Sequence, residues 1–318
     1  MPVPPPSIPG APSSLPADSL FFQGVQIGPG TPFQIKGNNG GKGFEGLDKP
    51  DVRSGNVNWA MWPGASVGNN QLGTRKPVVT LDVGPFASGY GSYGTLANAV
   101  AALVAACSTE GSTEYPLWIQ LPGMPLVCTY ARVLKTNFPW DLTADLGGLL
   151  ENGSIQFECT DPYLYSAPST STSLSLPGPA GGFSFNLTFP LTFGGGSTPN
   201  TATITNSGDV TCWPTLVING PCLNPTIANT SITGSPTIST QIQLNTGDQL
   251  WIDCRLGAIT YYPSGSTVGT PYQFVLQPGS EYFGLPPGSS TISFNSGDTS
   301  SVAGTLQVQS ASAWDALL

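Results

Sequence analysis

The sequence predicts a mainly β protein of two domains. Only 8% of its residues are charged, whereas soluble domains usually carry about 25%, and long exposed helices depend on Glu and Lys. The 40 Gly and 32 Pro cut the chain into short segments, which is typical of sandwiches and barrels. At 318 residues the chain also exceeds the size that one hydrophobic core usually reaches, about 250–300 residues.

The N-terminal part divides into a proline-rich segment and a domain. Residues 1–18 hold seven prolines and predict an extended N-terminal arm. Residues 19–165 predict a β-sandwich or split-barrel-like domain with one helix at about 95–108, where Leu96, Val100, Leu103, Val104 and Cys107 share one face. Strands are expected at 19–36, as a hairpin-like start, and at 78–83, 117–121, 127–133 and 154–160.

The second part reads as short strands only. Residues 166–182 are rich in Ser, Pro and Gly and predict a linker. Residues 183–318 predict a β-sandwich, beginning with the alternating Phe183, Phe185, Leu187 and Phe189. No cofactor is expected, because the glycine runs at 37–46 and 194–196 match neither nucleotide-binding pattern.

The composition argues against an enzyme. Histidine is absent, which removes the commonest general base and excludes Ser-His-Asp and Cys-His sites. Two carboxylates suffice for glycosidase chemistry, so a carboxylate-only hydrolase stays as the weakest hypothesis. The pairs considered are Asp248 with Asp253, Glu110 with Glu114, and Asp141 with Asp145.

Other site classes are equally poorly supported. The six cysteines contain no CxxC spacing, so no metal site is expected, and buried free thiols are favoured over three disulfides. The net charge of −9 with nine scattered basic residues disfavours nucleic acid and acidic membranes as partners. No signal peptide or membrane span is recognisable, so synthesis in a cytoplasm without export is expected.

Aromatic residues supply an alternative function. A sugar-stacking platform, as in carbohydrate-binding modules, would use aromatic rings, although packing in a core or a subunit interface is favoured. Trp251 is expected to face away from Leu250 and Ile252 and to be exposed. The candidates are Trp59, Trp62, Trp213, Trp251, Tyr261, Tyr262, Tyr272 and Trp314.

The order of several short motifs resembles the distal tail proteins of phages with long non-contractile tails. In the first half these are Phe22-Gln23-Gly24, Pro50-Asp51-Val52-Arg53-Ser54-Gly55-Asn56, Pro63-Gly64-Ala65, Arg75 before a strand, Pro116-Leu117 and Asp161-Pro162-Tyr163-Leu164-Tyr165. In the second half they are Asn206-Ser207-Gly208-Asp209 to Pro214, Gly220-Pro221, Gly247-Asp248-Gln249-Leu250-Trp251-Ile252-Asp253, Leu285 to Gly288, and Trp314. The match spans about residues 19–315 and does not include the N-terminal arm at 1–18.

The resemblance implies a structural virion protein without catalytic, cofactor or metal residues. Its N-terminal domains would form a hexameric ring that joins the tail tube protein to the tail-tip hub, with galectin-like C-terminal sandwiches projecting outward. It implies assembly in the bacterial cytoplasm and a final place at the tail tip. The tape measure protein and host glycans are further candidate partners.

Overall fold

The computed structural model describes residues 12, 14–36, 43–86, 89–108, 111, 113–141, 147–167, 169–177, 200–297 and 303–317. The chain folds into two compact units. The N-terminal unit is Ser7–Pro168 with Trp314–Leu318, and the C-terminal unit is Ser169–Ala313.

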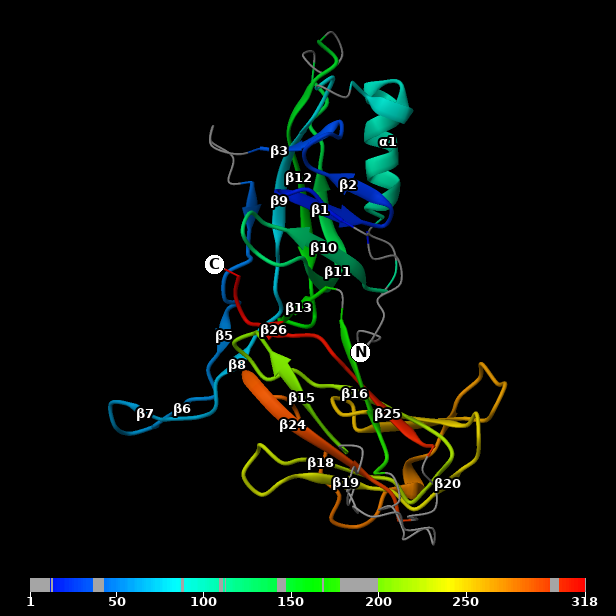
Figure 1. The fold of residues 1–318 in the computed structure, drawn as a ribbon. Helices are drawn as coiled ribbons and strands as arrows, with labels where there is room; N and C mark the ends of the chain where they lie inside the picture. The colour runs from blue at the N-terminus through cyan, green and yellow to red at the C-terminus, as the bar shows by residue number, and fades with distance from the viewer. Residues whose placement is uncertain are drawn as a thin grey trace, which may run out of the picture. The chain divides into compact units, whose positions relative to one another are not determined.

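The N-terminal unit is built on one strongly curved sheet (Figure 1). Its ends, β2 and β3, are joined by a turn in which Gly28 N–H donates to Phe33 O at 2.7 Å, so that the sheet nearly closes into a barrel. The path is β2 (Val25–Ile27), β1 (Ser19–Phe22), β10 (Tyr115–Gln120), β11 (Val127–Asn137), β12 (Leu150–Glu158), β9 (Val78–Val83) and β3 (Phe33–Ile35). Beside this path, β4 (Phe44–Glu45) pairs with β9, β13 (Leu164–Ser166) with β11, and β26 (Ala313–Trp314) with β13.

Every second side chain along the strands points into the space that this curved sheet encloses. In β9, Val79, Leu81 and Val83 are buried while the residues between them are partly exposed, as expected when successive side chains point to opposite faces. Phe22 and Phe157 meet edge to face at 5.1 Å between ring centroids. The strands predicted at 78–83, 117–121, 127–133 and 154–160 are therefore confirmed, and β12 begins four residues earlier than expected.

Helix α1 (Leu96–Ala106) confirms the helix predicted at 95–108. Thr95 caps it by accepting a hydrogen bond from Asn98 N–H on its Oγ1 at 3.3 Å. Leu96 and Leu103 are buried as expected, but Val104 is 46% exposed. The prediction that Val104 lies on the packed face of the helix was wrong. The small residues Ala99 and Ala106 occupy the buried face instead, where they let the helix approach the sheet closely.

Arg75 is buried beside the sheet, with 1% of its surface exposed. Its Nε donates to Pro162 O at 2.8 Å, and its Nη1 donates to Gly46 O at 3.1 Å and to Asp48 O at 2.7 Å. Its Nη2 donates to Asp315 O at 2.6 Å. Burial lowers the pKa of Arg75, and neighbouring acidic groups oppose that shift. One guanidinium thus holds three separate segments of the unit together.

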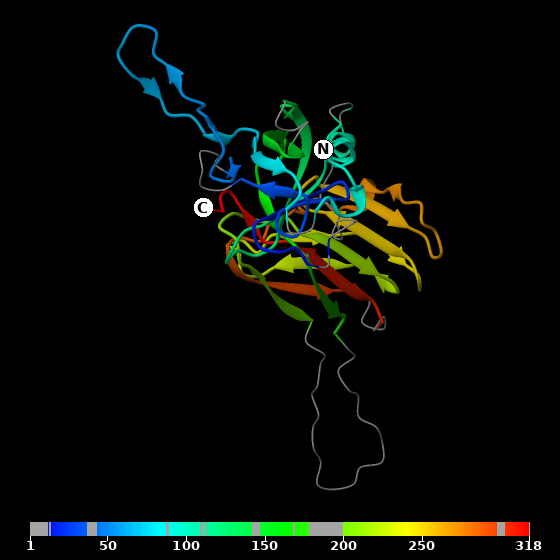
Figure 2. The same ribbon diagram turned by 90° about the horizontal axis from the view of Figure 1, so that it is seen from above.

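Two short ribbons and a 3-10 helix complete the N-terminal unit. The ribbons project from the sheet between residues 51 and 73 (Figures 1 and 2). These elements are β5 (Val52–Arg53) with β8 (Gln71–Leu72), β6 (Val57–Asn58) with β7 (Ala65–Ser66), and η1 (Gly91–Tyr93).

The C-terminal unit contains two larger antiparallel sheets. One follows the order β14 (Thr170–Ser175), β25 (Thr305–Ser310), β16 (Thr215–Asn219), β21 (Gln249–Asp253), β22 (Ala258–Tyr262) and β23 (Thr270–Pro271). The other follows β15 (Thr201–Asn206), β24 (Gly288–Asn295), β18 (Thr226–Asn229) and β19 (Thr237–Ser239). Smaller elements are β17 (Cys222–Leu223) with β20 (Gln243–Leu244), and the 3-10 helix η2 (Gln273–Val275).

Buried aliphatic and aromatic residues line one face of each sheet. The six-stranded sheet buries Leu216, Leu250 and Leu306, and the four-stranded sheet buries Ile227 and Phe294. Two antiparallel sheets with one apolar face each form a β-sandwich, which confirms the mainly β class. The strand expected from Phe183 to Phe189 lies outside the described residues.

Two boundaries differ from the sequence prediction. Residues 170–175, expected within the linker 166–182, form strand β14, because Leu174 is buried and the serines and threonines around it suit the exposed side of an edge strand. Residues 314–317, expected in the domain 183–318, belong to the N-terminal unit, where Leu317 joins the hydrophobic core. Most of the N-terminal arm expected at 1–18 lies outside the described residues.

The Arg75 contacts predict a large loss of stability in an Arg75→Met variant. Four carbonyl oxygens would lose a charged donor, and breaking a buried charged network typically costs about 3–5 kcal/mol. We expect the free energy of unfolding of the N-terminal unit, measured by urea denaturation, to fall by about that amount.

Arg132→Met is the matched control. Arg132 donates to Glu158 Oε2 from Nη2 at 2.6 Å and from Nε at 3.0 Å, but its side chain is 40% exposed. Exposed ion pairs contribute less than about 1 kcal/mol. Equal losses in the two variants would contradict the role given to Arg75.

Candidate assembly surface

The projecting segment between residues 51 and 73, which we call the hairpin arm, is folded along its length. Gly73 N–H donates to Asp51 O at 2.7 Å at its foot. Gly68 lies so close to the backbone of Gly55 that any side chain there would collide with it. Near the tip, Trp59 N–H donates to Gly64 O at 3.1 Å. These bonds give the hairpin arm a defined shape.

The Trp59 side chain adds to the fold of the tip. Its indole Nε1–H donates to Ser66 Oγ at 2.8 Å. Gly64 has φ +117°, and a Cβ there would touch the Trp59 ring. Trp59 thus braces the loop that carries Met61 and Trp62.

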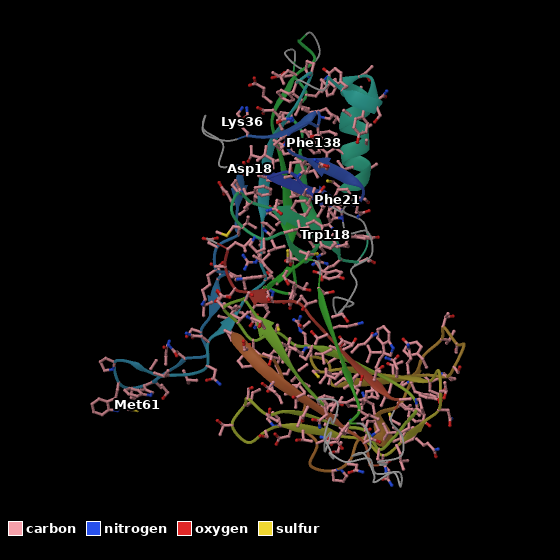
Figure 3. All side chains as sticks on the ribbon, in the orientation of Figure 1. Asp18, Phe21, Lys36, Met61, Trp118 and Phe138 are labelled. Atoms are coloured by element: carbon pink, nitrogen blue, oxygen red, sulfur yellow. The ribbon has the colours of Figure 1, made fainter. Side chains whose placement is uncertain are left out.

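The hairpin arm exposes apolar side chains and carries no charge over most of its length. Met61 is 89% exposed, Trp62 75% and Val67 94%, and Figure 3 shows Met61 at the tip. Residues 54–74 contain no Asp, Glu, Lys or Arg. A two-stranded ribbon is at best marginally stable by itself, and contiguous exposed apolar surface usually marks an interaction site. The hairpin arm is therefore the strongest candidate for a surface that becomes covered.

The sequence analysis grouped Trp59 and Trp62 with aromatic residues of the C-terminal domain as candidates for one sugar-stacking platform. They lie on the hairpin arm in the N-terminal unit, whereas Trp251, Tyr261 and Tyr262 lie on strands of the C-terminal unit. Trp314 is partly buried against the hydrophobic core of the N-terminal unit. The candidates therefore belong to at least two separate surfaces.

Within the C-terminal unit, aromatic rings form two groups. Trp251 and Tyr262 are 5.6 Å apart between ring centroids. Tyr272 lies 5.2 Å from Tyr261 and 4.3 Å from Phe274. Trp251 alternates with the buried Leu250 and Ile252 as expected, although it is only partly exposed. Trp213 is 45% exposed.

Asp248 and Asp253, the first carboxylate pair of the sequence analysis, both bond the backbone of turns. Asp248 accepts hydrogen bonds from Asn245 N–H at 2.8 Å and Ser264 N–H at 2.9 Å. Its pKa is lowered: burial raises it, but these hydrogen bonds outweigh burial. Asp253 accepts from Arg255 N–H at 2.9 Å and from Leu256 N–H at 3.0 Å. These hydrogen bonds from backbone amides give Asp248 and Asp253 a role in holding their turns.

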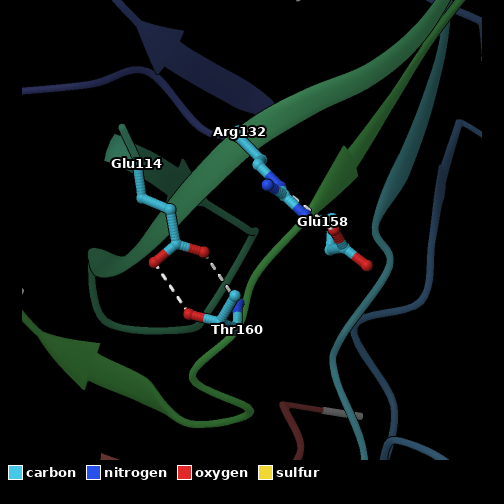
Figure 4. A network of polar contacts seen from close by, with 4 residues as sticks. All are labelled: Glu114, Arg132, Glu158 and Thr160. Carbon is cyan, nitrogen blue, oxygen red and sulfur yellow. Dashed lines mark hydrogen bonds and ion pairs between the residues drawn. The ribbon is translucent and has the colours of Figure 1, made fainter. Parts of the chain in front are cut away.

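Glu114 likewise holds the backbone. Its carboxylate accepts from Thr160 N–H at 2.8 Å and from Thr160 Oγ1–H at 2.9 Å, beside the Arg132–Glu158 ion pair (Figure 4). Glu110 and Asp145, the partners expected for Glu114 and Asp141, lie outside the described residues.

Comparisons with known proteins identify this fold. No protein-family model matches the sequence, and no curated protein matches it. The SPP1 Dit protein, presented as a paradigm of the hub adsorption apparatus in phages that infect Gram-positive bacteria, aligns over 92% of this chain and 97% of its own. The identity is 14% and the TM-score 0.57. The chain has the fold of SPP1 Dit.

Two structures of the phage P2 baseplate in its activated conformation, with Ca and with Sr, also align, over 87% of this chain and 90% of theirs. Their identity is 11% in each case, with TM-scores of 0.45 and 0.46. The fold assignment rests on SPP1 Dit, which agrees with the motif order read from the sequence.

Two of those motifs meet in space. Arg75 bonds the carbonyl of Pro162, and Asp161 accepts from Tyr163 N–H at 3.2 Å and from Tyr165 Oη–H at 2.8 Å. The arginine before the strand and the Asp-Pro-x-x-Tyr closure therefore form one structural cluster in this Dit-like fold.

All six cysteines are free and buried, as the sequence analysis favoured. Among the residues that the structure describes, no cluster of His, Cys, Asp and Glu could hold a metal ion. No helix within the same residues is long and apolar enough to cross a bilayer. Burial raises the pKa of every thiol, to about 12 for Cys107, Cys159, Cys212 and Cys254, to about 11 for Cys222, and further for Cys128.

These thiols should be inert in the folded protein. The thiolate is the reactive species, so we expect no reaction with a thiol reagent such as DTNB at pH 8, and six reactive thiols per chain in denaturant. The pKa of each thiol is higher in the folded chain than in the unfolded chain. Below about pH 8 the thiols are neutral in both states, so their ionisation costs no stability there. The free energy of unfolding should fall as the pH rises above about 9. Rapid labelling of the native chain would contradict this burial.

Proposed function

We propose that this protein is a structural component of a phage tail tip, a distal tail adaptor without catalytic activity. In this proposal it forms a hexameric ring that joins the tail tube protein to the hub, and the C-terminal units project outward. The fold shared with SPP1 Dit over 92% of the chain supports it.

The exposed hairpin arm is the main structural observation in favour of the proposed ring. An apolar, uncharged projection on one side of a subunit fits a head-to-tail contact, in which a different surface of the next subunit receives it. Repeated by rotation, such a contact closes a ring and covers the exposed Met61, Trp62 and Val67. The scarcity of charge in the whole chain, 8%, agrees with surfaces that are covered in the assembly.

A charge at the tip of the hairpin arm should therefore weaken the ring. Mass photometry of the purified full chain should detect particles of six times 32.9 kDa. A Trp62→Asp variant should need on the order of 30-fold higher concentration to form them, because losing an interface anchor typically costs about 2 kcal/mol.

Trp140→Asp is the matched control, because Trp140 is 50% exposed but lies outside the hairpin arm. It should leave the particle mass unchanged. A wild-type chain that stays monomeric at all concentrations and also in the presence of tail tube protein would overturn the proposal.

A second candidate function is glycan binding by the C-terminal unit. Thr305, Asn219, Gln249 and Tyr262 are in register across four strands of the six-stranded sheet. Gln249 Nε2 donates to Asn219 Oδ1 at 2.9 Å, and Trp251 Nε1–H donates to Gln249 Oε1 at 3.1 Å. A row of ordered amides beside aromatic rings is a surface suited to hydroxyl-rich ligands.

Glycan binding has its own test. The full chain should bind cell-wall polysaccharide, and Trp251→Ala should weaken binding about tenfold or more because a stacking ring is lost. Trp213→Ala, which removes an exposed indole of the same unit, should change it little. Absence of binding on a broad glycan array would remove this candidate and leave the ring untouched.

A further inference from the structure

Among the residues that the structure describes, those of the N-terminal unit enclose an apolar cavity. It has a volume of about 590 Å³ and lies between β3, β4 and the turn that joins β10 to β11. Cavities of about 300–1,000 Å³ accept groups of drug size, so a few large side chains fit. Its apolar wall consists of Ile35, Phe44, Leu47, Leu121, Pro122 and Met124.

A second cavity of the same unit has the opposite character. It measures about 530 Å³ and lies at the foot of the hairpin arm. Charged residues line much of it: Asp48, Lys49, Asp51, Arg53, Arg75 and Lys76. Inserting uncharged apolar side chains there would remove the exposed charges of Asp51 and Arg53 from water without providing new polar groups for them, which is unfavourable.

We propose that the tip of the hairpin arm of one copy docks in the apolar cavity of the next copy. The inference rests on the proposed ring and names the surface that receives the hairpin arm. Met61 and Trp62 are among the most exposed large apolar side chains of the unit, and the apolar cavity offers them a matching wall. A head-to-tail contact requires two different surfaces on each copy, and the tip and this cavity are such a pair.

The polar groups of the cavity are compatible with this occupant. Asp18 and Gln34 lie on its wall, and Figure 3 shows Asp18 on the body of the unit, apart from Met61. The Gln34 side chain donates from Nε2 to Gly28 O at 3.2 Å and Thr31 O at 2.7 Å, which fixes the amide. An indole N–H needs one acceptor when it is buried, and the Asp18 carboxylate or the Gln34 Oε1 supplies it for Trp62.

Disulfide trapping between copies tests the contact directly. The native thiols are buried, so introduced cysteines react selectively. A Met61→Cys chain is mixed with a Met124→Cys chain, since Met124 lies on the cavity wall and is 37% exposed. Under mild oxidation the mixture should form a cross-linked dimer at least about tenfold faster than a mixture of Met61→Cys with Trp140→Cys, because only a docked pair holds its thiols within bonding distance.

Three outcomes are decisive for the trapping. Faster cross-linking in the Met61/Met124 mixture supports the contact. Rings that form by mass photometry but cross-link no faster than the control overturn the docking site while the proposed function stands. A chain carrying both substitutions that forms its disulfide only within the monomer shows that the hairpin arm folds back on its own cavity, and also overturns the inference.

Cavity variants give an independent measure. Met124→Arg places a charge in the cavity and should raise the concentration needed for ring formation on the order of 30-fold. Met124→Leu keeps the wall apolar and should leave it unchanged. Rings of equal stability in both variants, with thermal unfolding unaltered, would contradict docking at this cavity.

Discussion

The buried guanidinium of Arg75 is the constraint on which the N-terminal unit depends. It donates hydrogen bonds to the carbonyls of Gly46, Asp48, Pro162 and Asp315, so segments distant in the sequence are bonded to the same charged group. An ionised group without water must keep all its partners, because each lost bond leaves charge unpaired. The hairpin arm begins just after Asp48 and ends just before Arg75. Both ends of the hairpin arm are therefore attached to chain segments that this guanidinium holds.

Much of the fold could be predicted because its signals are local. Alternation of apolar and polar residues predicted β12, and a period of 3.6 residues predicted α1. The errors arose where tertiary packing decides: Val104 is exposed because Ala99 and Ala106 fit the space above the sheet better. Strand β14 looked like a linker because serine-rich sequence carries little apolar signal, and only pairing with β25 reveals it.

The candidate surface was harder to predict than the fold. Trp59 and Trp62 were listed only as candidates for a sugar-stacking platform, because a sequence does not reveal that two aromatic residues lie on a projecting ribbon. One signal was present and could have been used: residues 54–74 lack any charge while containing two tryptophans and a methionine. The carboxylate pairs were the weakest hypothesis, because turn-forming and catalytic Asp residues look alike in a sequence until their hydrogen-bond donors are known.

The uncharged hairpin arm has a consequence for the conditions under which an assembled ring would hold together. Contacts that depend on ion pairs weaken as salt screens them over about 8–10 Å. Contacts between apolar side chains do not, and near room temperature they gain strength on warming because their driving force is entropic. A ring joined by Met61 and Trp62 would therefore keep its cohesion in dilute and in saline surroundings alike, and cold rather than salt would be the condition that loosens it.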